Sequence, residues 1–241
     1  MAKLKDAHAA RIARMPKRQR SNHESRTETP VSAASAVSTL KKFKAPKFDQ
    51  TVEVVLHLNI DPRQADQALR GSIALPAGIG KTKRVVAFCT PEVVGAAKEA
   101  GAVEAGGEEL VQKIEKGWMD FDVAVASPDM MRVISKLGRV LGPKGLMPSP
   151  KAGTVTKDVP QAVTEYGAGK VEYRNDKGGN IHAPIGKMSF SEGDLLANLE
   201  HFIRAIDGQR PSAVKGQFIK KIAVSGTMTP SVLVEIPGGA E

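Results

Sequence analysis

The sequence has few of the residues that build disulfides, metal sites and membrane spans. It contains one cysteine, Cys89, in 241 residues, so no intramolecular disulfide can form. Its five histidines are not spaced as metal ligands. The longest apolar runs, such as Val85–Cys89 and Val123–Ala126, have the length of a strand and not of a membrane span. We therefore expect no metal, no cofactor and no membrane partner, in a protein suited to a reducing cytoplasm.

Acidic residues are scarce at one end of the chain only. Residues 1–47 contain 12 Lys or Arg and three acidic residues, whereas residues 48–241 contain 23 of each sign. A basic arm on a neutral body is typical of binding to nucleic acid or another polyanion. We expect an arm at residues 1–38, in which Met1–Arg20 can form a helix on a polyanion and Ser21–Ser38 is disordered. An organellar transit peptide is the alternative interpretation of this basic, serine-containing arm.

The sequence patterns at the two ends of the body predict a half-buried sheet with a helix. Thr51–Ile60 alternates between apolar and polar residues, which is typical of a strand with one buried face. A helix is expected over Ser191–Ile206, with Ser191 as its cap. The other expected extended segments of these regions are residues 70–75, 170–174, 179–184, 217–225 and 231–236.

The middle of the chain alternates strand and helix, which predicts βαβ units and a parallel sheet. The fold class is therefore α/β and α+β in two domains: residues 39–76 and 163–241 form an α+β domain, and an α/β domain is inserted at 77–162. Linkers are expected near residues 76–81 and 163–170. The expected elements of the inserted domain are strands at residues 84–89 and 121–126 and helices at 91–100, 107–117 and Ser127 to about Leu141.

A loop rich in glycine and proline, Leu141–Thr156, interrupts this domain. Glycine and proline prescribe its backbone path. The loop lies in the last part of a segment, Met130–Lys157, that has six basic residues and no acidic one. The pattern indicates contact with an anion, for which Lys144 and Lys151 are the candidates.

Gly78–Thr82 (GIGKT) resembles the end of a phosphate-binding loop. That motif requires an earlier glycine where this chain has Leu75, and a helix directly after it. Here a strand-like run follows, so we interpret the segment as a glycine-rich hinge. A nucleotide-hydrolysing enzyme that uses Lys81 and Thr82 remains the competing class. No nucleophile or base has a recognisable partner elsewhere, so no catalytic residue is predicted.

Residues suited to RNA binding stand at three other places. Thr227–Ser231 joins two strands with hydroxyl groups and no charge, and alone reads as a turn. Phe48, just before a strand, is either a stacking platform or a core residue. An Asx- and Gly-rich turn predicts a hairpin between residues 170–174 and 179–184. Arg and Lys on and near this turn can pair with phosphates, and Asn, Asp and His can read base edges or the 2′-hydroxyl, with an ordinary polar turn as the alternative. The residues of this third group are Arg174, Asn175, Asp176, Lys177 and His182.

One long block is more specific than any of these. ISKLGRVLGPKGLMPSPKAGTVT (Ile134–Thr156) resembles the signature of the large-subunit ribosomal protein L-one family, bacterial branch, whose members form the mobile stalk beside the ribosomal exit site. The resemblance covers roughly residues 40–236 and leaves out the arm. It continues in four further blocks: Lys47–Val54, Gly117–Met131, Tyr173–Lys187 and Thr227–Ser231.

The resemblance implies a root domain made of both chain ends and an inserted Rossmann-like, three-layer domain. It implies a non-enzymatic, ribosome-bound cytoplasmic protein that is a monomer when free. Its partners would be stalk ribosomal RNA, exit-site transfer RNA, whose release it assists, and its own operon's messenger RNA, which it represses. Lys144 and Lys151 would be a secondary basic loop. The implied RNA-binding residues are Phe48, Thr51, Arg174, Asn175, Asp176, Lys177, His182, Thr227, Met228 and Ser231.

One position departs from the family pattern. The family commonly has glycine after Thr-Met, where this chain has Thr229. A β-branched residue resists positive φ, so the loop is expected to shift or Thr229 to be strained. A general RNA chaperone driven by the basic arm is a third functional class.

Overall fold

The computed structural model describes residues 12–64 and 66–236. The fold is mixed α/β: an antiparallel sheet joins segments from both chain ends, and a small parallel sheet lies between them in sequence. Contacts divide the chain into two compact units, one formed by the residues up to Leu69 and from Arg174 onward, the other by Arg70–Tyr173. None of the helices in the described ranges has the length and apolar character needed to cross a membrane.

Strand β1 (Thr51–Leu58) lies inside the four-stranded antiparallel sheet of the first unit. It pairs with β7 (Asn180–Lys187) on one side and β8 (Ile219–Gly226) on the other, and β9 (Val232–Val234) forms the edge beyond β8. The predicted alternation is confirmed, because every second side chain of β1 is buried. The residues of β1 on the open face are half-buried or exposed: Thr51, Glu53, Val55 and His57.

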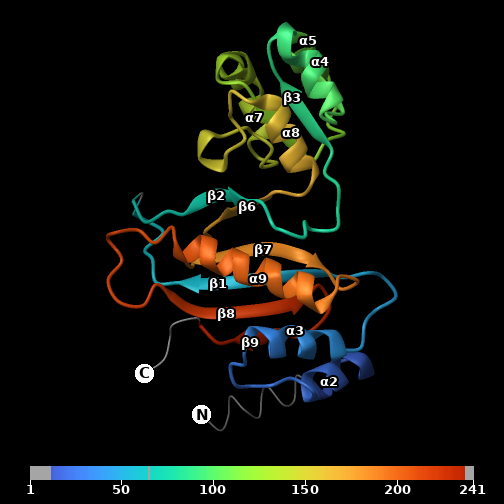
Figure 1. Ribbon diagram of the computed structural model, residues 1–241, viewed down its shortest axis with the longest axis vertical. Coiled ribbons are helices and arrows are strands. Elements are labelled where there is room, and N and C mark those ends of the chain that lie inside the picture. The colour runs from blue at the N-terminus through green and yellow to red at the C-terminus, as the bar shows by residue number, and fades with distance from the viewer. Residues whose placement is uncertain (1–11, 65, 237–241) are drawn as a thin grey trace. The chain divides into compact units, whose positions relative to one another are not determined.

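Helix α9 (Glu192–Asp207) covers the buried face of this sheet together with α3 (Ala33–Lys42) (Figure 1). Its predicted cap is confirmed: the Ser191 hydroxyl accepts a hydrogen bond from the Asp194 amide at 3.0 Å. The apolar stripe of α9 is buried, including Leu195 and Phe202. The helix leaves the opposite face of the sheet open.

The expected disorder over Ser21–Ser38 is wrong where the chain forms helices. Residues 33–38 belong to α3, and residues 21–24 belong to α2 (Lys17–Glu24), which extends past the expected helix end at Arg20. Ser32 caps α3, and Ala36, Val37 and Leu40 are buried against the rest of the unit. The burial of these three apolar residues stabilises the helix, although the composition of the segment is typical of disorder. The expected helix over residues 1–11 lies outside the described residues.

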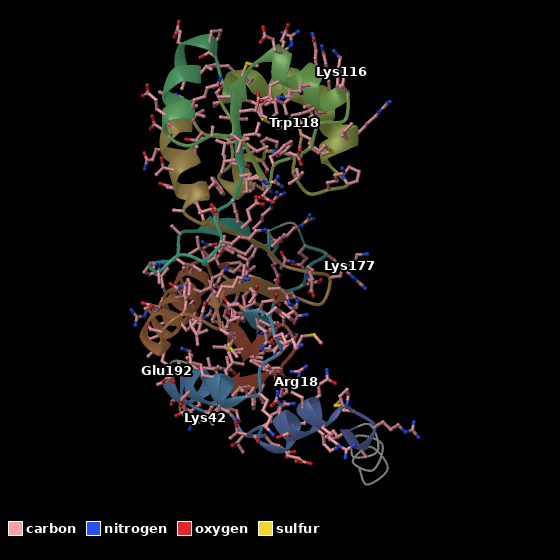
Figure 2. All side chains as sticks on the ribbon, turned by 90° about the vertical axis from the view of Figure 1, so that its right-hand side faces the viewer. Arg18, Lys42, Lys116, Trp118, Lys177 and Glu192 are labelled. Carbon is pink, nitrogen blue, oxygen red and sulfur yellow. The ribbon has the colours of Figure 1, made fainter. Side chains whose placement is uncertain are left out.

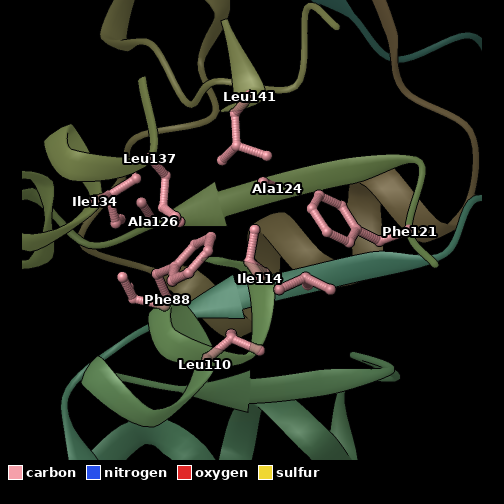
Figure 3. Close-up of a cluster of buried hydrophobic side chains, with 11 residues drawn as sticks. Phe88, Leu110, Ile114, Phe121, Ala124, Ala126, Ile134, Leu137 and Leu141 are labelled. Carbon is pink, nitrogen blue, oxygen red and sulfur yellow. The ribbon is translucent and has the colours of Figure 1, made fainter. Parts of the chain in front are cut away.

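In the second unit, parallel strands β4 (Glu104–Gly106), β3 (Val85–Phe88) and β5 (Val123–Ala126) form a sheet with a core on each face. Helices α4 (Pro91–Glu99) and α8 (Val159–Gly167) pack on one face. On the other face, α5 (Glu108–Glu115) contributes Leu110 and Ile114 to the cluster that surrounds Phe88 (Figure 3). Strand β4 was not predicted, because its three residues carry no alternating pattern.

The helix expected from Ser127 to Leu141 is broken into short turns. They run through η1 (Pro128–Met130), α6 (Met131–Ile134), η2 (Ser135–Leu137) and α7 (Gly138–Leu141). Ser127 makes no capping hydrogen bond, so its predicted capping role is wrong. Ile134, Leu137 and Leu141 still face the core, which shows why an apolar period alone could not reveal the breaks.

Two further expectations are wrong in part. The linker placed at residues 163–170 is helical as far as Gly167, and Val163 and Tyr166 of α8 are buried in the α/β core. Residues 170–174 and 179–184 do not pair as the two strands of a regular hairpin. A single antiparallel bridge, Asn175–Ile181, closes the turn, while β6 (Val171–Arg174) pairs with β2 (Arg70–Ile73) and β7 pairs with β1. The turn between β6 and β7 therefore connects two different sheets.

We predict that Leu40→Ala destabilises the protein by about 2–5 kcal/mol, because it removes a fully buried side chain from α3. Lys42→Ala on the exposed end of the same helix is the control, with an expected effect within about 0.5 kcal/mol. Urea unfolding of both variants measures the difference. Equal stability of the two variants would show that α3 does not pack in the core.

Candidate RNA interface

A tight turn after β8 carries the Thr-Met pair. The Thr229 amide donates to the Gly226 carbonyl at 3.1 Å, and the Gly226 amide donates to the Thr229 hydroxyl at 2.8 Å. The hydroxyl of Thr229 therefore closes the turn from within, a contact that a glycine at this position could not make.

Strand β1 and the residues before it hold this turn in place. The Thr227 amide donates to the Thr51 carbonyl at 3.1 Å, and the Thr51 amide donates to the Thr227 hydroxyl at 3.2 Å. The Met228 amide donates to the side-chain oxygen of Gln50 at 2.8 Å, and Gln50 is fully buried. The backbone amides of the turn are thus bonded within the protein, and the side chain of Met228 lies outward, with 42% of the residue exposed.

Phe48 lies two residues before Gln50 and is 52% exposed, so the core interpretation of this residue is wrong. Only four large hydrophobic residues are exposed in the described ranges, and Phe48 and Met228 are two of them. The bonds of Gln50 and Thr51 to the turn bring these two residues into one region. An exposed apolar pair on a hydrogen-bonded backbone is typical of a binding surface.

The turn that follows β6 is built around one carboxylate. Asp176 accepts hydrogen bonds from the amides of Gly178 and Asn180, each at 2.8 Å, and from the Asn180 side chain at 3.0 Å. These bonds, those from Asn180 first, lower the pKa of Asp176 to about 2. Gly179 adopts φ of 76°, which suits glycine alone in so tight a turn. Asp176 thus organises the turn, and its contact with RNA stays a prediction.

Asn175 is also engaged within the protein. Its side-chain oxygen accepts from the Leu69 amide at 2.8 Å, and its own amide donates to the Leu69 carbonyl at 3.0 Å. Arg174, Lys177 and His182 are exposed, and Lys177 points outward from the turn (Figure 2). The His182 ring lies 3.6 Å from the Asp176 carboxylate. The turn therefore offers cationic side chains to an anion.

The structure places the predicted residues of the first unit in two groups along β1. Phe48, Thr227 and Met228 adjoin Thr51, at the start of β1. The Asp176 turn adjoins the other end, where Asn180 pairs with His57. Six residues of strand separate these ends, which is about 20 Å. His182 lies between the groups, opposite Val55, and Ser231 is half-buried just before β9.

Lys144 and Lys151 belong to the second unit, and both are exposed. The Lys144 ammonium lies 2.8 Å from the Met119 sulfur. Gly153, at φ of 72°, ends the 3-10 turn Pro150–Ala152, after which Thr154 bonds back to Ser149. The loop thus has the defined path expected from its glycines and prolines. The six basic residues of the acid-free run are all exposed: Arg132, Lys136, Arg139, Lys144, Lys151 and Lys157.

The competing phosphate-loop motif lacks its structural context. No helix follows Gly78–Thr82, and the next element is β3. Lys81 is exposed. Within residues 12–64 and 66–236, no group of three His, Cys, Asp or Glu side chains is placed to hold a metal ion.

Sequence reasoning missed four residues that support the Thr-Met turn: Arg18, Asn22, Gln50 and Lys187. The Lys187 ammonium donates to the Thr51 hydroxyl at 2.9 Å, so this hydroxyl already accepts one hydrogen bond within the protein. Gln50 stands within a recognised block and could have been considered. No motif or spacing marks Arg18 or Asn22.

Residues 40–230 match the model of the Ribosomal protein L1p/L10e family. The chain belongs to this family. It is therefore a non-enzymatic RNA-binding protein of the large ribosomal subunit that serves translation. The match spans most of the chain and both groups of site residues, except Ser231, and it excludes helix α2.

We predict that Asp176→Asn destabilises the protein at neutral pH and that this effect fades in acid. The pKa of Asp176 is about 2 in the folded protein, below the ordinary value of about 3.9. Its stabilising contribution is therefore complete above about pH 4 and is lost as pH falls toward 2. Urea unfolding of wild type and variant from pH 7 to pH 2 measures the difference. Asp66→Asn, at an exposed position, controls for net charge, and a pH-independent difference would contradict the prediction.

Proposed function

We propose that the open face of the β7-β1-β8-β9 sheet binds the stalk RNA of the large ribosomal subunit. The observation that carries this proposal is the exposure of Phe48 and Met228 beside a turn whose amides are all bonded. RNA loops present bases that stack on aromatic side chains, and ribose 2′-hydroxyls that pair with polar groups. Phe48 supplies the ring, and Thr227 and the adjoining turn supply the polar edge.

The cationic turn at the other end of β1 supports contact with the phosphates of the same RNA. Arg174 and Lys177 are exposed, and neither forms an ion pair with another described residue. About 20 Å of strand separates them from the Thr-Met turn. Phosphate contacts alone carry no sequence information. We therefore expect the protein to distinguish a folded RNA that reaches both ends of β1 from a simple duplex by its shape.

We propose three further activities for this protein in the cytoplasm, where it binds ribosomes and is a monomer when free. It assists the release of deacylated transfer RNA from the exit site, with the basic residues of 130–157, Lys144 and Lys151 among them, as the contact surface. It represses translation of its own operon's messenger RNA by binding a part of that RNA that folds like the stalk RNA. The α/β part acts as an inserted domain that moves with the stalk. Support for the transfer RNA contact comes from the exposure of six cationic residues in an acid-free stretch.

The apolar pair provides the sharpest test. We expect Phe48→Ala and Met228→Asp each to weaken binding to a stalk RNA fragment about 10- to 100-fold, since stacking on one base contributes about 1–3 kcal/mol. Val103→Ala is the matched control, because Val103 is 49% exposed and lies in the second unit. Filter binding against a generic duplex measures the preference. Unchanged affinity in both variants, with native thermal unfolding, would refute the site.

The cationic turn is tested through salt dependence. Arg174→Ala and Lys177→Ala are expected to reduce the slope of log K against log salt by about 0.7–0.9 each, the value for one lost phosphate contact. Titrations with the stalk fragment between low and high KCl give the slope. Phe48→Ala should leave it unaltered. A slope that stays at the wild-type value in both cationic variants would exclude these residues from the interface.

A further inference from the structure

Helix α2 has no apolar side chain with which to pack on the body. Its sequence is KRQRSNHE, and a helix that is polar on all sides requires another source of stability. Two of its side chains, Arg18 and Asn22, reach other segments of the first unit. They stand four residues apart and therefore share one face of the helix. This face is held by hydrogen bonds.

Asn22 fixes the helix to the chain that leads into the RNA site. It is 2% exposed. Its amide nitrogen donates to the Lys44 carbonyl at 3.1 Å, and its oxygen accepts from the Lys44 amide at 2.8 Å. Both polar atoms of a buried side chain are thus paired with one backbone position, an arrangement that is costly to break.

Arg18 joins that segment to the Thr-Met turn. Its Nη1 atom donates to the Lys44 carbonyl at 3.3 Å and to the Met228 carbonyl at 3.2 Å. Lys44 precedes Phe48 by four residues in the chain. Figure 2 marks the position of Arg18 in the N-terminal part of the unit. One guanidinium therefore connects the segment before Phe48 with the residue that carries the other exposed apolar side chain.

We propose that Arg18 is a positioning residue of the RNA site, held in place by Asn22, so that the site extends beyond the family's matched region onto α2. The inference rests on the proposed function, in which Phe48 and Met228 contact RNA together. Arg18 acts on the geometry of the pair and need not touch the RNA. Its Nη1 atom serves both carbonyls with N–H groups whose directions are fixed in the guanidinium plane. A lysine ammonium keeps the charge without this fixed planar geometry.

The first test uses the free protein and requires no RNA. Arg18→Ala and Arg18→Lys are expected to speed amide hydrogen exchange at Met228 and Thr229 about tenfold, because the turn loses its tie to α2. Lys17→Ala is the matched control, since it removes a neighbouring exposed charge, and its exchange should equal that of wild type. Amides inside β1 should be protected in all three variants. Unchanged exchange at the turn in Arg18→Ala would overturn the proposal.

The second test separates positioning from phosphate contact. Arg18→Ala and Arg18→Lys should both weaken binding to the stalk fragment about tenfold and leave the salt slope unchanged. Combined with Met228→Asp, Arg18→Ala should add less than twofold, because it acts through the same turn. Wild-type affinity in Arg18→Lys, or a slope that falls by about 0.9 in Arg18→Ala, would identify a charge contact and overturn the positioning role. If the wild-type protein shows no preference for the stalk fragment, the proposed function is overturned, and with it the RNA role of Arg18. The hydrogen-exchange result would still show whether Arg18 holds the Thr-Met turn.

Discussion

The hydrogen bonds between Thr51 and Thr227 are the constraint on which the Thr-Met end of the sheet depends. They connect residues 176 positions apart and extend the pairing of β1 with β8 beyond the last regular residue of β8. With Gln50 bonded to the Met228 amide, the turn has no free amide with which to rearrange. Its shape is therefore set by the sheet and not by the side chains that it presents.

This arrangement explains how two large apolar side chains remain exposed. Burying a phenylalanine or methionine stabilises a protein by about 1.5–3 kcal/mol, so an unconstrained loop would fold such residues inward. Here the backbone on both sides is held by polar contacts: Asp49 accepts hydrogen bonds from Ser189, Gln50 is buried, and Arg18 holds the Met228 carbonyl. The protein gives up burial at this place and keeps a fixed apolar surface. Such a cost is understandable where a partner covers the surface.

The sequence predicted what is local or periodic and missed what is long-range or masked by composition. The alternation of β1, the apolar runs of β3 and β5 and the Ser191 cap each rest on a few neighbouring residues, and all are present. Helix α3 was obscured by its serines and alanines, and α8 by the expectation of a linker. Residue types at the Asp176 turn suggested RNA contact and did not reveal that Asp176 holds the turn together or that Asn175 bonds to Leu69. Arg18 lies 210 residues from its acceptor at Met228, a relation that no spacing can reveal.

The two ends of β1 favour different contributions to binding. The Thr-Met end is held by hydrogen bonds and presents two exposed apolar side chains. In the proposed interface, its contacts therefore depend mainly on the shape of the RNA and on stacking. The Asp176 end carries exposed cations, whose attraction to phosphate is strong but unspecific. Between them, Glu53 is exposed on the open face, where its negative charge would repel phosphates that approach the middle of the sheet. Under the proposed function, a body without net charge has little general affinity for RNA. An RNA gains the full set of proposed contacts only when it reaches both ends of β1 and keeps its phosphates away from Glu53.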